Sequence, residues 1–199
     1  MILIQFTGLS GSGKTTLAEN VRNLLMDKGY KVEIIDGDVY RKNLCRDLGF
    51  SKDDRCENVR RLFSVGKDFV KSKIIVLMSV INPYEDLRNE ISQYKFVKTV
   101  FLDSSIDNLI KRDSKGLYKK ALLPDSDSNK IKNFTGISDV YEVPLKADLI
   151  LKTDFETVPV STDKLYHFIV GTLSEISCSW RGYFGYNILF SIPIIGFIF

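Results

Sequence analysis

The feature that most constrains this 199-residue chain is the run GLSGSGKT at residues 8–15. It matches the pattern GxxxxGK[ST] at every specified position, with an apolar run before it and an amphipathic stretch after it. Glycines allow backbone angles that point several N–H groups at one phosphate, and a helix starting near Lys14 adds its positive dipole end. A chance glycine turn is the alternative, which motif and context together disfavour. We therefore predict a phosphate-binding loop (P-loop).

The residue types of this loop also assign roles. Lys14 can reach the β- and γ-phosphates of ATP, and the Thr15 hydroxyl can ligate Mg²⁺. The predicted ATP contacts in the loop are Gly8, Leu9, Ser10, Gly11, Ser12, Gly13, Lys14, Thr15 and Thr16.

Short apolar runs alternate with longer amphipathic stretches along most of the chain, as a parallel sheet with crossover helices requires. The expected strands are Ile2–Thr7, Lys31–Ile35, Ile74–Ser79, Val97–Leu102 and Asp148–Lys152. The expected helices are Lys14–Lys28, about Asp54 to Ser72, Tyr84–Tyr94, Ser105–Arg112 and Thr162–Ile176. The predicted fold class is therefore α/β, with a five-stranded parallel sheet flanked by helices on both faces.

Composition excludes several classes of function. Apolar residues make up 44% and charged residues 27%, which is typical of a folded domain, and the net charge of +3 is too small to indicate a nucleic-acid surface. The only histidine, His167, rules against a histidine triad or a multi-histidine metal site. Cys45, Cys56 and Cys178 form no metal-type cluster, so we expect free thiols in a reducing compartment.

The second expected strand is followed by Asp36-Gly37-Asp38. Because the carboxyl ends of adjacent parallel strands open into one crevice, these carboxylates can face the P-loop, one toward Mg²⁺ and one toward an acceptor hydroxyl. A polar turn with an N-cap aspartate explains the same letters equally well. The chain is too short for most motors and has no NKxD-like guanine motif, so a small-molecule kinase is favoured over other P-loop proteins.

Further blocks follow the P-loop in a fixed order. They are DGDVYRKNL, DLGFSKDDRCENVRR, INPY, RDSKGLYKKA, IKNFTGI and YEVP, and together they resemble the adenylyl-sulfate kinase family from Ile2 to Asp154. The resemblance implies transfer of the ATP γ-phosphate to the 3′-hydroxyl of adenylyl sulfate, a step of sulfate assimilation that uses Mg²⁺. It also implies a lid over the nucleotides, which we place at about residues 113–146 because this stretch breaks the strand–helix alternation.

The resemblance assigns further site residues. It places Asp36 at the Mg²⁺ with Thr15, Asp38 at the acceptor hydroxyl, and Arg41 as a charge-neutralising group beside Lys14. Phe50 and Phe134 would sandwich an adenine, and Arg55 and Asn58 would contact the phosphosulfate and sugar. Arg112 and Lys115 would cover ATP and the acceptor. The full acceptor set that it implies is Asp36, Gly37, Asp38, Arg41, Phe50, Arg55, Asn58, Ile81, Asn82, Lys115, Asn133 and Phe134.

This chain departs from the family pattern at three places. Val39 replaces the usual asparagine after DGD, and Asn82 replaces a serine that some members can phosphorylate. An asparagine cannot carry a phosphoryl group, so only direct transfer is open at this position. The lid also has extra residues around PDSDSN (124–129), which we expect to be a disordered surface insertion. These departures keep two alternatives open: a kinase for a related nucleotide such as a cytidine diphosphate derivative, and a weakly catalytic nucleotide-binding module tethered by its tail.

The last 18 residues, GYFGYNILFSIPIIGFIF, carry no charge. Glycines and Pro193 interrupt the run, and no basic cluster follows, so a membrane contact, an interface element or a poorly packing terminus are all open interpretations. We expect a kinase domain at residues 1–178 and a hydrophobic tail at 179–199. We further expect small-molecule nucleotide substrates, no nucleic-acid partner, a homodimer as one option, and a cytoplasmic location, since no secretory leader is visible.

Overall fold

The computed structural model of the protein describes residues 1–181. Strands and helices alternate through most of the chain, as the sequence predicts. In order they are β1 (Leu3–Thr7), α1 (Lys14–Asp27), β2 (Val32–Asp36), α2 (Gly37–Arg41), α3 (Lys52–Lys71), β3 (Ile75–Ser79), α4 (Glu85–Ser92), β4 (Val97–Asp103), α5 (Ile106–Arg112), α6 (Leu117–Ala121), β5 (Leu149–Lys152) and α7 (Val158–Arg181).

The five strands form one sheet in the order β2-β3-β1-β4-β5, and every neighbouring pair is parallel. β1 (LIQFT) and β3 (IVLMS) are mainly apolar, and both are buried along their whole length because helices cover both faces of the sheet. The predicted fold class is confirmed. The sheet order places β1 at the centre of the sheet, and the P-loop that follows it at the middle of the sheet's carboxyl edge.

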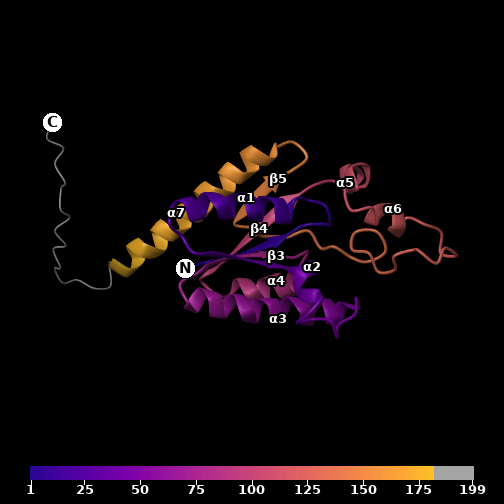
Figure 1. Ribbon diagram of the computed structural model, residues 1–199, viewed down its shortest axis with the longest axis horizontal. Coiled ribbons are helices and arrows are strands. Elements are labelled where there is room, and N and C mark those ends of the chain that lie inside the picture. The colour runs from indigo at the N-terminus through magenta and orange to yellow at the C-terminus, as the bar shows by residue number, and fades with distance from the viewer. Residues whose placement is uncertain (182–199) are drawn as a thin grey trace.

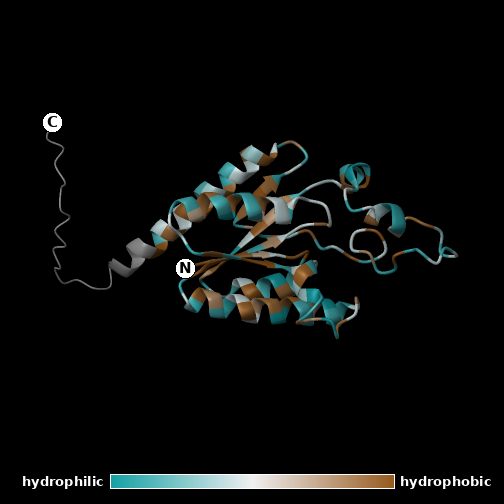
Figure 2. Cartoon of the chain, viewed as in Figure 1, coloured by the Kyte–Doolittle hydropathy of each residue, from teal (hydrophilic) through white to brown (hydrophobic). Residues whose placement is uncertain are grey.

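Helices cover the sheet in two layers (Figure 1). α1 and α7 lie on one face, and α3 and α4 lie on the other. Each layer has its own apolar cluster, one with Leu17, Val21 and Leu165 and the other with Val59, Leu62 and Leu87. In Figure 2 the strands are hydrophobic and the helices turn hydrophilic residues outward, which is the pattern expected of amphipathic crossover helices.

The structure differs from the sequence-based expectations in four segments. It contains two short helices, α2 and α6, that were not predicted, because five residues are too few to show a helical period. α7 begins earlier and ends later than predicted. Residues 124–129 were expected to be disordered, but they form exposed turns in which Asp127 N donates to Pro124 O at 3.0 Å and Lys130 pairs with Asp125 at 2.7 Å.

The uncharged run 182–199 lies outside the described residues, and so does the side chain of Cys178. Cys45 and Cys56 are free thiols, as expected. No helix within residues 1–181 is both long enough and apolar enough to cross a membrane.

Gly66 on α3 provides a test of how tightly this helix packs on the sheet. A Cβ at this position would lie 2.6 Å from Leu3 Cδ1, and Ile35 and Val76 close the same space. Gly66→Ala should lower the free energy of unfolding by about 1–2 kcal/mol, because overpacking outweighs the gain of about 1 kcal/mol in helix propensity. Urea denaturation measures the change.

The matched control for this prediction is Gly171→Ala on α7, where nothing lies within 4 Å of the added Cβ. This variant should be stabilised by about 0.5–1 kcal/mol. Equal stabilisation of both variants would show that α3 does not pack as closely on β1 as the structure indicates.

Candidate active site

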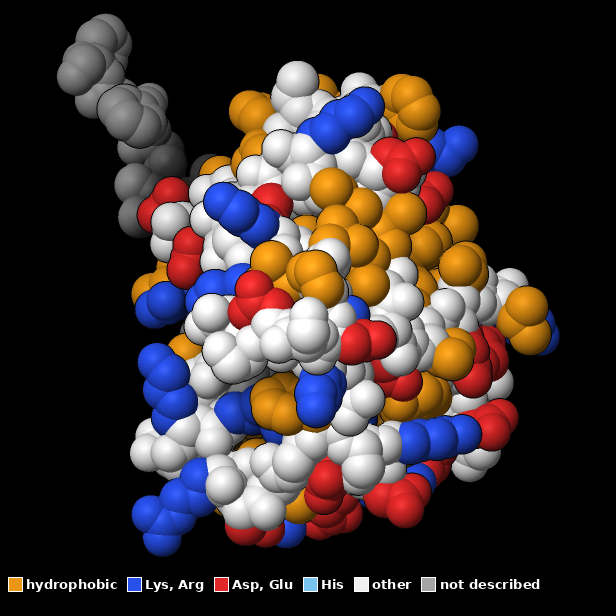
Figure 3. All heavy atoms as spheres, turned by 90° about the vertical axis from the view of Figure 1, so that its right-hand side faces the viewer, with side chains coloured by type: hydrophobic (Ala, Val, Ile, Leu, Met, Phe, Trp, Pro, Cys, Tyr) orange, Lys and Arg blue, Asp and Glu red, His pale blue; other side chains and the backbone are white. Residues whose placement is uncertain are grey.

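A cavity of about 680 Å³ opens at the carboxyl edge of the sheet. Four segments form its walls: the P-loop after β1, the Asp36–Arg41 turn after β2, the Ile81–Pro83 loop after β3, and the lid that follows α5. Figure 3 views the molecule from this end, where hydrophobic side chains gather centrally among basic and acidic ones. Parallel strands bring these distant segments together because they all end at the same edge.

The P-loop has the backbone that its glycines predict. Gly11 and Gly13 have φ of 77° and 98°, a left-handed conformation that residues with a Cβ rarely adopt. Gly8 is needed for a different reason, since an added Cβ would lie 2.9 Å from Leu102 O. α1 begins at Lys14, so its N-terminus points its free N–H groups into the cavity, and this is an anion-binding arrangement.

Lys14 is held inside the loop that it follows. Its Nζ donates to Gly8 O and to Leu9 O, both at 2.8 Å, and its residue is only 9% exposed. The pKa of Lys14 is lowered to about 7, first by burial and then by the charge on Lys115, while Asp38 and Asp36 oppose the shift. A buried lysine beside a row of backbone N–H groups forms a site that suits a negatively charged group such as a phosphate.

Thr15 begins a cluster of oxygen atoms beside the P-loop. Its Oγ1 donates to Asp36 Oδ2 at 2.8 Å and lies 3.3 Å from Ser79 Oγ at the end of β3. Hydroxyl and carboxylate oxygens are hard donors of the kind that Mg²⁺ accepts, and Mg²⁺ usually takes only one or two protein ligands in addition to phosphates and water. Among residues 1–181 no group of three or more His, Cys, Asp or Glu side chains could hold a metal by itself. The donor set therefore fits a magnesium–nucleotide rather than a free metal ion.

The two aspartates of the DGD motif take different partners. Asp36 Oδ1 accepts from Asp38 N at 2.9 Å and caps α2, while its Oδ2 faces Thr15. One carboxylate therefore caps the helix with one oxygen and turns the other toward the P-loop, and its role at Mg²⁺ stays a prediction. Asp38 is exposed to the cavity and accepts from Lys115 Nζ of the lid at 2.8 Å.

Aromatic and basic side chains form the wall opposite the P-loop. Phe50 is 56% exposed and stacks under the guanidinium of Arg41, which lies 4.6 Å from the ring centroid. Arg55 is buried and bonds Phe50 O at 3.1 Å, Asn133 O, and Asp139 Oδ2 at 3.1 Å. An arginine held by one carboxylate and two carbonyls is oriented before any ligand arrives.

The lid is a folded segment with its own small apolar core. Phe134, 9% exposed, contacts the ring of Tyr118 edge-on at 5.0 Å, and Leu109 and Ala121 pack beside them. The Tyr118 hydroxyl donates to Ser10 O at 2.9 Å, which ties α6 to the P-loop. Burial raises the pKa of Tyr118 to about 12, so this hydroxyl keeps its proton.

The structure brings most of the predicted site residues together. Those that line the cavity are Ser10, Gly11, Gly13, Lys14, Thr15, Thr16, Asp36, Gly37, Asp38, Arg41, Phe50, Arg55, Asn58, Ile81, Asn82, Lys115, Asn133 and Phe134. Gly8, Leu9 and Ser12 belong to the same loop but do not line the cavity. Arg112 lines a separate small cleft beside Ser10 and is paired with Asp154 at 3.3 Å.

Sequence reasoning missed several cavity residues. Ser79, Val80, Pro83, Ser114, Lys132 and Thr135 line the same space. Ser79 and Val80 lie at the end of β3, and the other four are next to a predicted site residue, so strand ends and chain neighbours were the available signals. Thr135 Oγ1 and Asn58 Oδ1 are buried without a hydrogen-bond partner among the described residues, which marks this wall as prepared for a polar ligand.

Asn82 lies in the wall with an unusual backbone conformation. Its φ is 43°, in the left-handed region that asparagine tolerates better than most residues. Its side chain is turned beneath the loop, where Nδ2 donates to Gln5 Oε1 at 3.1 Å. The residue is 1% exposed, so its main influence on a ligand is through the backbone that it shapes.

Comparison with known proteins agrees with this geometry. The family model described as "Adenylylsulphate kinase" matches residues 1–152. The chain is 47% identical over 165 residues to an adenylyl-sulfate kinase of Chloroflexus aurantiacus, which covers 82% of this chain and 86% of that relative. It is 44% identical over 170 residues to an adenylyl-sulfate kinase of Halothermothrix orenii, covering 84% and 89%. The chain belongs to the adenylyl-sulfate kinase family.

A solved structure gives the same result in three dimensions. The APS kinase of Mycobacterium tuberculosis in complex with AMPPNP and APS superposes with a TM-score of 0.78 at 34% identity, covering 84% of this chain and 96% of that one. The resemblance stated from the sequence is confirmed, and the P-loop kinase fold with it. The role of each residue in this chain remains a prediction.

The lowered pKa of Lys14 predicts that ATP binding takes up a proton. In the free protein the lysine is mostly neutral at pH 8, because its pKa is about 7. Bound phosphates favour the charged ammonium and so raise the pKa of Lys14. At a pH between the pKa of the free protein and that of the complex, ATP binding therefore adds a proton to Lys14. The affinity for ATP falls as the pH rises above 7. Calorimetry of ATP binding at pH 8 in buffers of different ionisation enthalpy measures the uptake.

The control for this experiment is Lys14→Met, titrated at higher ATP concentration, which should bind without proton uptake. A binding heat for the unsubstituted protein that is independent of the buffer would show that Lys14 is already charged in the free site.

Proposed function

We propose that this protein transfers the γ-phosphate of ATP to the 3′-hydroxyl of adenylyl sulfate, giving ADP and 3′-phosphoadenylyl sulfate. The observation that carries the proposal is one cavity that joins a P-loop, an oxygen donor set for Mg²⁺ and a wall of oriented arginines and aromatic rings. The first two features suit ATP with Mg²⁺, and the third suits an acceptor that carries both an adenine and a phosphosulfate. Membership of the family supports the same reaction.

The P-loop side binds and neutralises the phosphates. The backbone N–H groups of the loop and the Lys14 ammonium would hold the β- and γ-phosphates, with Thr15 and Asp36 holding the magnesium. Bound Mg²⁺ supplies charge neutralisation on the phosphate oxygens. Lys14 must then leave Gly8 O and Leu9 O, which it bonds in the free site, so its buried charge exchanges carbonyl dipoles for an anion.

Asp38 and Lys115 form the pair nearest the transfer step. In the free site the lysine neutralises the aspartate at 2.8 Å. When phosphates enter, they compete for the same lysine, so Asp38 is released to accept the hydrogen bond of the acceptor hydroxyl. The hydroxyl proton moves to Asp38 as its oxygen bonds to the γ-phosphorus and the bond to the ADP oxygen breaks.

The opposite wall suits adenylyl sulfate. Phe50 offers an exposed ring and Phe134 a buried one, and both line the cavity, so an adenine can enter between them. Arg41 and Arg55 place two cationic groups at the same wall, where the phosphosulfate would lie. Arg112, which is paired with Asp154 beside the P-loop, would meet the nucleotide base of ATP from the lid hinge.

Transfer is direct in this proposal. Asn82 cannot accept a phosphoryl group, and its side chain is bonded to Gln5 rather than open to solvent. The residues proposed for ATP and those proposed for the acceptor line one continuous cavity, so both nucleotides can be bound together, which in-line transfer requires. Initial-rate lines should therefore intersect when both substrates are varied.

Turnover by the purified protein with Asp38→Asn tests the proposal. Unsubstituted protein with ATP and Mg²⁺ should phosphorylate adenylyl sulfate in preference to cytidine diphosphate derivatives. Asp38→Asn should lose about 100- to 10,000-fold in kcat, because the proton acceptor is removed, while ATP binding remains. A coupled assay of ADP release and a direct assay of the product measure both. Preference for another acceptor, or unchanged kcat in the variant, would overturn the proposal or the role of Asp38 respectively.

Phe50 and Phe134 should affect the acceptor differently from ATP. Phe50→Ala removes an exposed stacking ring and should raise KM for adenylyl sulfate about ten- to hundredfold, with little change in Tm. Phe134→Ala should weaken the acceptor as well but also lower the free energy of unfolding by about 3–5 kcal/mol, since this ring fills the lid core. Phe155→Ala, an exposed phenylalanine outside the cavity, is the control. Equal weakening of ATP and acceptor would make Phe50 a general packing residue.

Three further predictions concern the protein as a whole. We also propose a kinase domain at residues 1–178 followed by a tail at 179–199, and a cytoplasmic location, with a homodimer as one option for its assembly. A relative from Thiobacillus denitrificans, 25% identical, is a hexameric APS kinase.

A further inference from the structure

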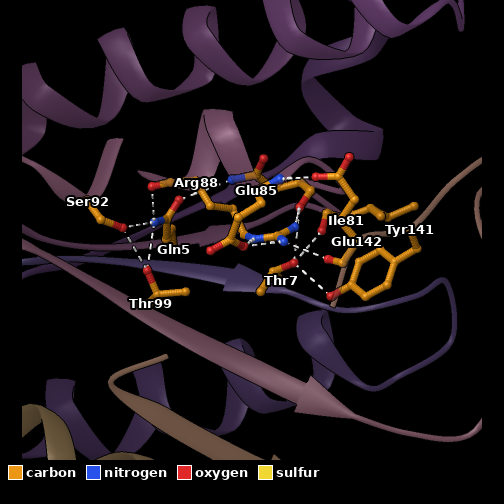
Figure 4. Close-up of polar contacts among 10 residues, drawn as sticks. Gln5, Thr7, Ile81, Glu85, Arg88, Ser92, Thr99, Tyr141 and Glu142 are labelled. Carbon is orange, nitrogen blue, oxygen red and sulfur yellow. Dashed lines mark hydrogen bonds and ion pairs between the residues drawn. The ribbon is translucent and has the colours of Figure 1, made fainter. Parts of the chain in front are cut away.

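A buried polar network (Figure 4) includes the Ile81–Pro83 loop, which lines the active-site cavity. Its centre is Arg88 of α4, whose residue is only 2% exposed. The guanidinium donates to Asn82 O at 2.7 Å and to Glu142 O at 2.6 Å. It also bonds Glu85 Oε2, at 2.6 Å from Nη2 and 3.1 Å from Nε. One side chain therefore joins the Ile81–Pro83 loop to the end of the lid.

Other bonds close the same junction from two sides. Glu142 N donates to Pro83 O at 2.9 Å, and the Glu142 carboxylate accepts from Glu85 N at 2.6 Å. With the two Arg88 bonds, these contacts make residues 82–83 and 142 one rigid unit. The lid is therefore fixed near Glu142 against the Ile81–Pro83 loop, hereafter the acceptor loop. Lys115, Asn133 and Phe134, earlier in the lid, line the cavity.

Tyr141 extends the network to the P-loop strand. The Thr7 hydroxyl donates its single proton to Ile81 O at 2.8 Å or Asn82 O at 3.1 Å, so the Tyr141 hydroxyl, 2.9 Å away, must be the donor to Thr7. Gly8 N, the first amide of the P-loop, also bonds Ile81 O at 3.4 Å. The phosphate side and the acceptor side are thus connected through one loop.

Burying an arginine has a desolvation cost, so the bonds that this side chain makes besides its ion pair need an explanation. Glu85 alone would neutralise Arg88, and an apolar pair would fill the same volume at less desolvation cost. The two carbonyl bonds use instead the planar fork of the guanidinium, which a lysine cannot reproduce. Both carbonyls belong to segments that line or close the cavity, not to the helix that carries Arg88.

We propose that Arg88 is a positioning residue for the transfer reaction, which sets the acceptor loop and the lid end at a fixed distance from the P-loop. The inference rests on the proposed function, because it concerns where the acceptor lies relative to the γ-phosphate. Small misplacements of reacting groups cost large factors in rate even when binding of one substrate is unaffected. Arg88 touches neither substrate and acts through Asn82 and Glu142.

The test compares Arg88→Lys with the unsubstituted protein at a temperature well below both values of Tm. The lysine keeps the charge beside Glu85 but cannot bridge both carbonyls. We expect kcat/KM for adenylyl sulfate to fall about 10- to 100-fold, with the Kd for ATP in the absence of acceptor changed by less than about twofold. Amide exchange of the peptide around Glu142 should become faster, because its tie to Pro83 loosens.

Two matched variants separate positioning from stability. Leu165→Ala removes a fully buried side chain on the opposite face of the sheet and should lower Tm with unchanged kcat/KM. Tyr141→Phe removes only the bond to Thr7 and should lower kcat/KM for the acceptor about two- to tenfold, which keeps the test valid if Arg88→Lys does not fold.

Distinct results identify each failure. Kinetics of Arg88→Lys and Tyr141→Phe that match the unsubstituted protein would overturn the positioning role. A loss of kcat/KM in Leu165→Ala as large as that in Arg88→Lys would also overturn it, because the loss would then follow stability. Equal loss of ATP affinity would also overturn it, because the effect would then be general. Failure of the unsubstituted protein to phosphorylate adenylyl sulfate would instead overturn the proposed function, and the exchange of the Glu142 amide would still report whether Arg88 holds the lid end.

Discussion

Five parallel strands end at one edge of a sheet, and the functional organisation of this protein depends on that constraint. β1 lies in the middle of the strand order, so the P-loop is flanked by the segments that follow β3 and β4. Asp36 and Ser79 are register partners at the carboxyl ends of β2 and β3. Thr15 meets them there because α1 begins just after the loop that follows β1 at the same edge. No local sequence property could bring them together, whereas the parallel ladder does so without any strain.

Electrostatics in the free cavity has a simple logic. Lys14 is bound by loop carbonyls, Lys115 by Asp38, and Arg55 by Asp139, so each of these three cations already has an oxygen partner. A buried charge without a partner would be costly, and the partners lower that cost in the absence of ligand. Phosphates then compete for cations that are already in place. In the proposed reaction, binding is an exchange of oxygen partners that frees Asp38 from Lys115.

The lid is attached to the rest of the protein at two places, one near α6 and one near Glu142. Near α6 the lid is attached through the Tyr118 hydroxyl and the ring contact with Phe134. Near Glu142 it is attached through Arg88 to the acceptor loop. Gln5, inside β1, continues the network by donating to Ser92 and Thr99 at 2.8 Å and accepting from Asn82. A polar residue in a central strand is tolerated because every atom of its amide has a partner.

The amino-acid sequence alone determined the nucleotide site and the α/β fold, because glycines at required backbone angles and apolar runs of strand length act locally. It also indicated most of the cavity through motif blocks such as DGD and FTGI. Only the tertiary structure decided that Asp36 serves both as helix cap and as partner of Thr15, and that Asn82 turns inward toward Gln5. Arg88 gave no signal in the sequence, since a single charged residue on an amphipathic helix usually faces solvent. Its burial follows from carbonyls 6 and 54 positions away along the chain, and sequence patterns do not report contacts of that kind.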